Sequence, residues 1–162
     1  MKLKLMTIIL AGLVSQSVMA STVVERKAMR EAEAKIVEAA EQTKATCGNA
    51  ELAVSVNWDE YRSMISANEK VLQDNRYQGQ WVLSHTADRN TSVFEALSNI
   101  CNDDEDYKEV IAELSAVVIT PKPAFTDSDS SFKLDGTTLV IESGHRMNRS
   151  ASDFVRPIKQ LF

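Results

Sequence analysis

The sequence has few of the residues on which enzyme chemistry usually depends. It contains only two histidines and two cysteines among 162 residues. There is no Gly-x-Ser-x-Gly elbow for a serine nucleophile and no Cys-x-x-Cys pair for redox or metal chemistry. Catalytic triads are assembled from distant segments, whereas Ser84, His85 and Asp88 fall within one short stretch. We therefore predict no catalytic residue, no cofactor and no metal centre.

The N-terminus lacks an apolar run long enough to cross a bilayer, which takes about 20 residues. Residues 1–20, MKLKLMTIILAGLVSQSVMA, place two lysines before a short apolar stretch and end with small or moderate residues. This arrangement is typical of a secretory signal peptide. We predict cleavage after Ala20, a single domain over residues 21–162, a periplasmic or secreted location and no membrane anchor.

The expected mature chain also lacks an excess of positive charge. Loss of Lys2 and Lys4 with the signal peptide changes the formal net charge from −5 to −7. Nucleic acids and anionic membranes bind basic surfaces, so we expect neither as a partner. A basic envelope or secreted protein is the partner that this charge favours.

The two cysteines, Cys47 and Cys101, stand 54 positions apart. An exported protein meets an oxidising compartment, where an isolated pair forms a disulfide. Closing a loop of this length stabilises the fold by about 4 kcal/mol in the chain-entropy model. We predict one structural disulfide.

Glycine and proline are absent from residues 21–46, which predicts a long N-terminal helix. Small and apolar residues recur there at spacings of three and four, and Gly48 supplies a stop. They are Met29, Ala32, Ile36, Ala40, Thr43 and Cys47. The alternative, a partner-binding coiled coil, would require heptads of large residues, which this segment does not sustain.

Further elements follow from periodicity and turn signals. Strands are predicted over 51–57 and 115–120, and a hairpin over 132–134 and 137–142 around Asp135-Gly136. Helices are predicted over 58–65, with Asn57 as the cap, and over 91–100. A final helix is predicted to begin at Ser150 or Ser152 and to run to Phe162. Residues 68–80 are expected to be partly helical. Helices precede the hairpin along the chain, which favours an α+β fold with helices packed on a small antiparallel sheet.

Four acidic residues follow Cys101 in ICNDDEDYKEV. A calcium loop needs acids at alternate positions, then a glycine and a distant glutamate, and this stretch lacks that pattern. Asn102 or Asp103 is instead expected to cap a helix whose first turn is acidic. Asp127-Ser128-Asp129 also fails as a calcium loop, because Phe132 occupies the glycine position; it is interpreted as a solvated turn.

Two places are candidates for binding. Trp81 follows the polar residues Gln-Gly-Gln and is the better candidate of the two tryptophans for an exposed aromatic anchor. Ser143, Gly144, His145 and Arg146 are expected to form an exposed loop. Trp58, at the end of an apolar strand, is interpreted as a core residue.

The segments CGNAELAVSVNW and NICNDDEDY resemble those of small secreted proteins of Gram-negative bacteria that have no assigned activity. The resemblance covers about a third of the chain. It implies export and a linked cysteine pair, and it implies no mechanism.

These observations favour an exported, non-enzymatic protein-binding module. In its concrete form it is an inhibitor or immunity protein for a cationic envelope enzyme such as a muramidase, with loop 143–146 entering a cleft as Ser-Gly loops do in proteinaceous lysozyme inhibitors. A periplasmic small-ligand or lipid carrier would require an apolar cavity between helices and sheet. A hydrolase would require His85 or His145 to meet a carboxylate and a hydroxyl in a cleft.

Overall fold

The computed structural model describes residues 22–146 and 149–162, so the predicted signal peptide lies outside the described residues. Four consecutive helices are followed by three consecutive strands, which confirms the α+β class, and the described part of the chain begins with a long helix. In order, the elements are α1 (Val23–Cys47), β1 (Ala53–Val56), α2 (Trp58–Ala67), α3 (Glu69–Asp74), α4 (Gly79–Asp103), α5 (Glu105–Ala112), β2 (Ala116–Pro121), β3 (Ser131–Asp135), β4 (Thr138–Ser143) and α6 (Ser152–Lys159).

Helix α1 has well-defined ends. The side chain of Thr22 accepts a hydrogen bond from the backbone of Glu25, and the Glu25 carboxylate accepts one from the backbone of Thr22, which forms a capping box. At the other end Gly48 adopts a left-handed conformation with φ of 72°, and its N–H donates to the carbonyl of Lys44. The predicted stripe is buried along this helix from Ala32 to Cys47, whereas Met29, its first member, is half-buried.

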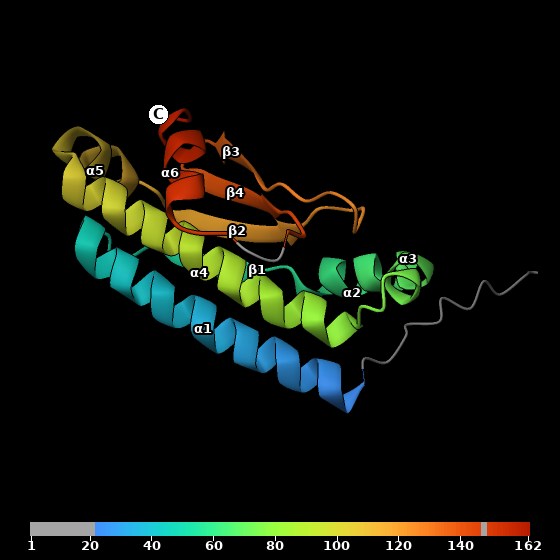
Figure 1. Ribbon diagram of the computed structural model, residues 1–162. Coiled ribbons are helices and arrows are strands. Elements are labelled where there is room, and N and C mark those ends of the chain that lie inside the picture. The colour runs from blue at the N-terminus through green and yellow to red at the C-terminus, as the bar shows by residue number, and fades with distance from the viewer. Residues whose placement is uncertain (1–21, 147–148) are drawn as a thin grey trace, which may run out of the picture.

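Helices α1 and α4 lie side by side along most of their length (Figure 1). Alanines on α1 leave room for the larger side chains of α4, among them Phe94 and Leu97, which are fully buried. The hydroxyl of Thr43 bonds across the interface, donating to the carbonyl oxygen of Phe94 at 2.8 Å and lying 2.9 Å from the Ser98 hydroxyl. This polar contact fixes the register of the two helices.

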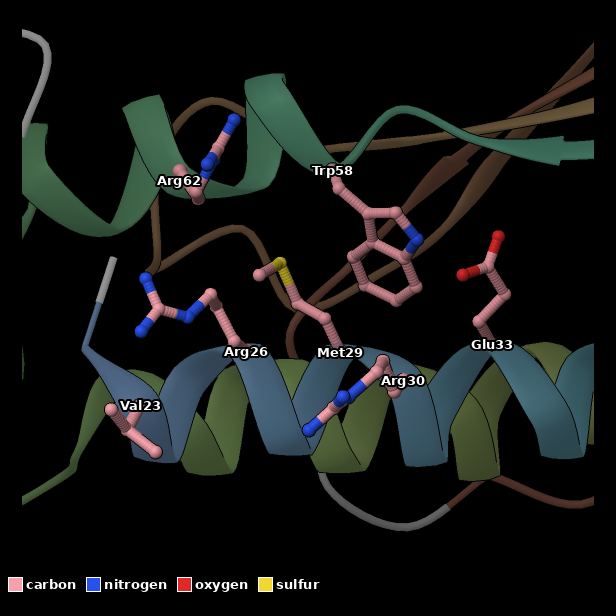
Figure 2. A pocket seen from close by; sticks show the side chains of 7 residues that line it. All are labelled: Val23, Arg26, Met29, Arg30, Glu33, Trp58 and Arg62. Atoms are coloured by element: carbon pink, nitrogen blue, oxygen red, sulfur yellow. The ribbon is translucent and has the colours of Figure 1, made fainter. Parts of the chain in front are cut away.

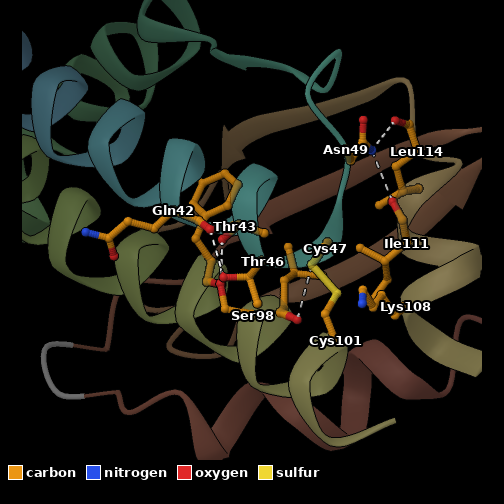
Figure 3. Close-up of a disulfide and its surroundings, with 12 residues drawn as sticks. Gln42, Thr43, Thr46, Cys47, Asn49, Ser98, Cys101, Lys108, Ile111 and Leu114 are labelled. Carbon is orange, nitrogen blue, oxygen red and sulfur yellow. Dashed lines mark hydrogen bonds between the residues drawn. A yellow bond between two sulfur atoms is a disulfide. The ribbon is translucent and has the colours of Figure 1, made fainter. Parts of the chain in front are cut away.

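The predicted disulfide is present and joins the ends of the two long helices (Figure 3). Cys47 is the last residue of α1 and Cys101 lies in the last turn of α4, with 5.3 Å between their Cα atoms. Beside the disulfide, the Asn49 amide donates to the carbonyls of Ile111 and Leu114 at 3.2 and 2.8 Å. The end of α1 is therefore tied both to α4 and to the C-terminal end of α5.

Helix α4 is longer than expected, since a single helix spans the region from Gly79 to Asp103. The predicted helix over 91–100 is only its second half. The first half contains the polar stretch HTADRN, which obscures the apolar periodicity, yet Thr86, Arg89 and Asn90 are buried there. The first half of α4 therefore buries a hydroxyl, a guanidinium and an amide inside the protein.

The sheet has four strands in the order β1-β2-β4-β3, and it is mixed. Only the β3–β4 hairpin is antiparallel, while β1–β2 and β2–β4 are parallel. The expectation of an antiparallel sheet is therefore wrong outside the hairpin. The reason is that helices α2 to α5 form the crossover from β1 to β2, and long crossovers of this kind produce parallel neighbours.

One face of the sheet carries the core. Val117, Ile119, Leu139 and Ile141 are fully buried on this face, whereas their neighbours along each strand are half-buried or exposed. Helices α4 and α6 pack over the buried face, and α6 also touches β3 (Figure 1). In residues 22–146 and 149–162, no helix is both long and apolar enough to cross a membrane.

Candidate functional site

The segment that was expected to be an exposed loop, Ser143 to Arg146, is mostly buried. Ser143 is the last residue of β4 and is 1% exposed, His145 is 7% exposed, and only Arg146 is exposed. The backbone N–H groups of His145 and Arg146 donate to the carbonyls of Asp127 and Ser128 at 2.8 and 3.1 Å. These bonds continue the β4 strand alongside the 127–129 turn, so this segment does not project into solvent.

Gly144 explains why the two segments approach so closely. A Cβ atom at this position would lie 2.4 Å from the backbone of Asp129 and 2.5 Å from the carbonyl oxygen of Ser128. Only glycine allows this contact without displacing one backbone or the other. The Ser-Gly dipeptide therefore serves close packing here.

The structure nevertheless brings His145 together with Trp81, the other predicted binding residue. Tyr77 contacts Trp81 edge-to-face, with 5.5 Å between ring centroids, and packs on Phe125 at 5.0 Å. Phe125 in turn packs on His145 at 5.5 Å, and His85 lies 5.7 Å from Tyr77. We call these five residues the aromatic patch. Trp81 is 41% exposed, and Tyr77, His85 and Phe125 are half-buried.

The surroundings of the two histidines in the patch favour their neutral form. Burial lowers the pKa of both His85 and His145, and the nearby guanidinium of Arg89 lowers both further. The Tyr77 hydroxyl is hydrogen-bonded to Nδ1 of His85, and Nε2 of His145 lies 2.9 Å from the Lys122 carbonyl oxygen, to which it donates. Burial also raises the pKa of Tyr77. Among the described residues, neither histidine meets a carboxylate and a hydroxyl as a catalytic triad requires.

Beneath the patch lies Arg89, a buried cation that is 3% exposed. Its guanidinium donates to the Thr86 hydroxyl at 3.0 Å and to the Arg146 carbonyl at 3.4 Å, and no carboxylate of residues 22–146 and 149–162 pairs with it. Burial lowers the pKa of Arg89, but an arginine keeps its charge in proteins. Arg89 therefore places a positive charge under the patch and ties α4 to the 143–146 segment.

Exposed carboxylates stand beside the patch. The charges of Asp88 and Asp127 partly oppose the lowering of the pKa of His85 and of His145, respectively, so each acid lies near one histidine. Asp88 forms an ion pair with Lys35 at 3.2 Å, with both side chains more than half exposed, and Asp127 is exposed. A partially exposed aromatic cluster with acids at its rim has the composition of a protein-binding surface.

A second feature, which the sequence interpretation missed, is a groove between α1 and α2 (Figure 2). Its volume is about 460 Å³, and it combines apolar side chains with three arginines. The lining residues are Val23, Arg26, Met29, Arg30, Glu33, Trp58 and Arg62. We call it the cationic groove. Trp58 is half-buried at its edge, not enclosed in the core as expected. The arginines were visible in the sequence at spacings of four on α1, but the pairing of α1 with α2 was not.

A neighbouring groove of about 420 Å³ lies on the other side of Arg62. Side chains of Ile65, Leu72 and Tyr77 line it together with the start of α1, so it extends from the cationic groove towards the aromatic patch. Neither groove lies between the helices and the sheet: residues of α1 and α2 line the first, and residues at the start of α1, in α2 and α3, and at the start of α4 line the second.

The acidic stretch after Cys101 forms the junction of two helices. Asn102 and Asp103 belong to the end of α4, and the residue that caps α5 is Asp104, one position beyond the expected cap. The Asp104 carboxylate accepts from the N–H of Tyr107 at 3.5 Å and from Lys159 at 3.2 Å, and the bond from Lys159 lowers its pKa. Within the described part of the chain, no three His, Cys, Asp or Glu side chains gather where they could hold a metal ion.

Comparison with known proteins found no match to a family model, to a curated protein or to a solved structure.

Proposed function

We propose that this chain is an exported, non-enzymatic protein-binding module that uses the aromatic patch as its contact surface. The observation that carries the proposal is the exposure of Trp81 in a cluster of aromatic rings that the fold holds in place. Tyr77 and Phe125 fix the neighbouring rings, so little side-chain entropy remains to be lost on binding. Tryptophan, tyrosine and arginine are the residues that most often dominate binding energy at protein interfaces.

The partner that the surface favours is a basic envelope or secreted protein. The net charge of the expected mature chain is −7, and Asp88 and Asp127 place exposed carboxylates beside the patch. An inhibitor or immunity protein for a cationic envelope enzyme such as a muramidase fits both features. Because the 143–146 segment is buried, Trp81 takes the place of that segment as the element that enters the partner's cleft.

Export supports the same interpretation. The disulfide between Cys47 and Cys101 suits an oxidising compartment, and the resemblance to small secreted proteins of Gram-negative bacteria implies it too. A hydrolase has less support, since both histidines are committed to structural hydrogen bonds. A carrier with its ligand enclosed between helices and sheet has less support as well, because the two grooves lie elsewhere.

The proposal is tested by binding of the mature protein to a panel of basic muramidases and to the basic fraction of an envelope extract. Trp81→Ala is the test variant, and Phe162→Ala is its matched control, because Phe162 is 39% exposed against 41% for Trp81. A central aromatic anchor is worth about 2 kcal/mol or more, so Trp81→Ala should weaken binding about thirtyfold while Phe162→Ala leaves it unchanged. Higher salt should slow association, because charges at the rim mainly raise the association rate.

Equal loss of affinity in the two variants would contradict the assignment of the patch. So would binding that salt does not affect, or a failure of every basic protein to bind at low salt. Thermal melting of each variant provides the folding control, and affinities are compared at a temperature at which both variants are folded.

A further inference from the structure

We propose that the cationic groove is a binding site for a medium-chain fatty acid, with the carboxylate near Arg26 and Arg62 and the alkyl chain along Met29 and Trp58. This site is separate from the aromatic patch and goes beyond the protein-binding function proposed above. Three observations carry it: the shape of the groove, the unpaired charge in it, and the apolar surface between the charges.

The groove is formed by two helices whose side chains project into the space between them. Figure 2 shows Met29 and Trp58 pointing from α1 and α2 into the same gap, with Arg26 and Arg62 at one end and Glu33 at the other. Its volume of about 460 Å³ falls in the range of about 300–1,000 Å³ that is usual for small-molecule sites. Trp58 also packs on Tyr61, with 5.5 Å between ring centroids, so its indole is held in position before any ligand arrives.

The charge of the groove is opposite to that of the whole chain. Arg26 and Arg30 face no carboxylate within ion-pair distance among the described residues, although the chain has more acidic than basic residues. They also stand four positions apart on α1, a spacing at which like charges repel. Arg62 pairs with the exposed Asp59. An anion bound between Arg26 and Arg62 would supply the partner that Arg26 lacks, and the N-terminal end of the α1 dipole favours negative charge at the same place.

The apolar surface decides between classes of anion. Between Arg26 and Glu33 the lining consists of the thioether of Met29 and the indole of Trp58, which offer few hydrogen-bonding groups. An acidic peptide or a nucleotide would leave its own polar groups unpaired there, which is costly when they are desolvated. An alkyl chain requires no hydrogen bonds. Glu33 repels a second anion, so the groove favours a ligand with one charged end.

The direct test is calorimetric titration of the mature protein with decanoate below its micellar concentration. Decanol has an alkyl chain of similar length with a neutral end, and decyltrimethylammonium has one with a positive end. Each should bind at least tenfold more weakly than decanoate. Arg26→Gln and Arg62→Gln should each weaken decanoate binding about tenfold, as expected for loss of one charge-assisted interaction. Arg156→Gln is the control, since Arg156 is exposed on α6, away from the groove.

Several results would overturn the inference: no binding of decanoate, equal affinity for decanol, or equal effects of Arg62→Gln and Arg156→Gln. Binding of an acidic peptide that Arg26→Gln weakens, without binding of decanoate, would assign the groove to a protein segment instead. Self-association that Arg30→Gln abolishes would assign it to a second copy of the chain. Trp81→Ala should leave decanoate affinity unchanged, and Arg26→Gln should leave the binding of a basic protein unchanged, so the two proposals can fail separately.

Discussion

Removal of the disulfide is the perturbation whose effect can be worked out most fully from the structure. Cys47 and Cys101 connect the C-terminal ends of α1 and α4, and both are nearly fully buried at 2% and 3% exposed. We consider Cys47→Ser, Cys101→Ser and the double variant. Each of the three removes the same covalent link.

The magnitude follows from the length of the loop that the link closes. A separation of 54 residues gives about 4 kcal/mol of denatured-state entropy in the chain model, and native-state relaxation reduces this value, so we expect a loss of roughly 2–4 kcal/mol. At position 47 the Cys Sγ lies 3.8 Å from the carbonyl oxygen of Leu97. A serine hydroxyl there has an acceptor within reach, so the penalty for a buried hydroxyl should be small.

Urea unfolding followed by circular dichroism measures the effect. Because the single variants remove one shared interaction, the double variant should be about as stable as either single variant, and the three effects should not add. The variants should also lower the midpoint of the urea transition. An unchanged midpoint after reduction of the wild-type protein, or a double variant that loses the sum of the two single effects, would refute the reasoning.

Three further predictions concern stability. Gly144→Ala should lower the free energy of unfolding by about 1–3 kcal/mol in urea titration, because the added Cβ would contact the Asp129 backbone at 2.4 Å; an unchanged midpoint would contradict that contact. Asp104→Ala should lower the melting temperature more than Asp103→Ala, since only Asp104 caps α5 and bonds Lys159. Added calcium should not shift the melting temperature of the protein. A calcium-dependent shift that the two substitutions abolish would restore the acidic stretch as a metal site. Burial lowers the pKa of His145, so below about pH 6.5 the unfolded chain binds more protons than the folded protein. The free energy of unfolding should therefore be at its full value above that pH and fall as the pH drops further. His145→Gln should flatten this pH dependence between about pH 7 and pH 5, and equal slopes for variant and wild type would contradict the role of His145.

Local signals in the sequence predicted most of the secondary structure. The helix over 58–65 begins at Trp58 after the Asn57 cap, as expected, and ends two residues later than predicted. The hairpin forms around Gly136, whose φ of 58° is the conformation that an Asp-Gly turn needs. These elements depend on neighbours in the chain, which is why their boundaries could be predicted to within a few residues. The capping box of Thr22 and Glu25 was a further local signal that the interpretation overlooked.

Features that depend on distant residues could not be predicted in the same way. The parallel pairing of β1 with β2 brings Val54 beside Val117, and no local pattern specifies this partner. The burial of His145 depends on the carbonyl of Asp127 across a turn, whereas its sequence surroundings, Ser-Gly-His-Arg, are those of an exposed loop. The polar face of α4 was misleading for the same reason: Arg89 is buried by segments that lie far away in the sequence.

In the candidate site, too, local features could be predicted and contacts between distant segments could not. Trp81 was the better candidate of the two tryptophans for an exposed anchor because of its polar neighbours, and this residue is 41% exposed. Its contact with Tyr77, and the link through Phe125 to His145, join residues from three separate segments. The cationic groove likewise required the pairing of α1 with α2, which the sequence does not encode in any short motif.

The central claim is that the aromatic patch binds a basic protein. Its most direct measurement is the equilibrium affinity of the mature protein for a basic muramidase, compared at low salt among wild type, Trp81→Ala and Phe162→Ala. Wild type and Phe162→Ala should bind tightly and Trp81→Ala about thirtyfold more weakly, with all three proteins folded at the assay temperature. Equal affinities of all three proteins, or no measurable binding to any member of a basic muramidase panel, would contradict it.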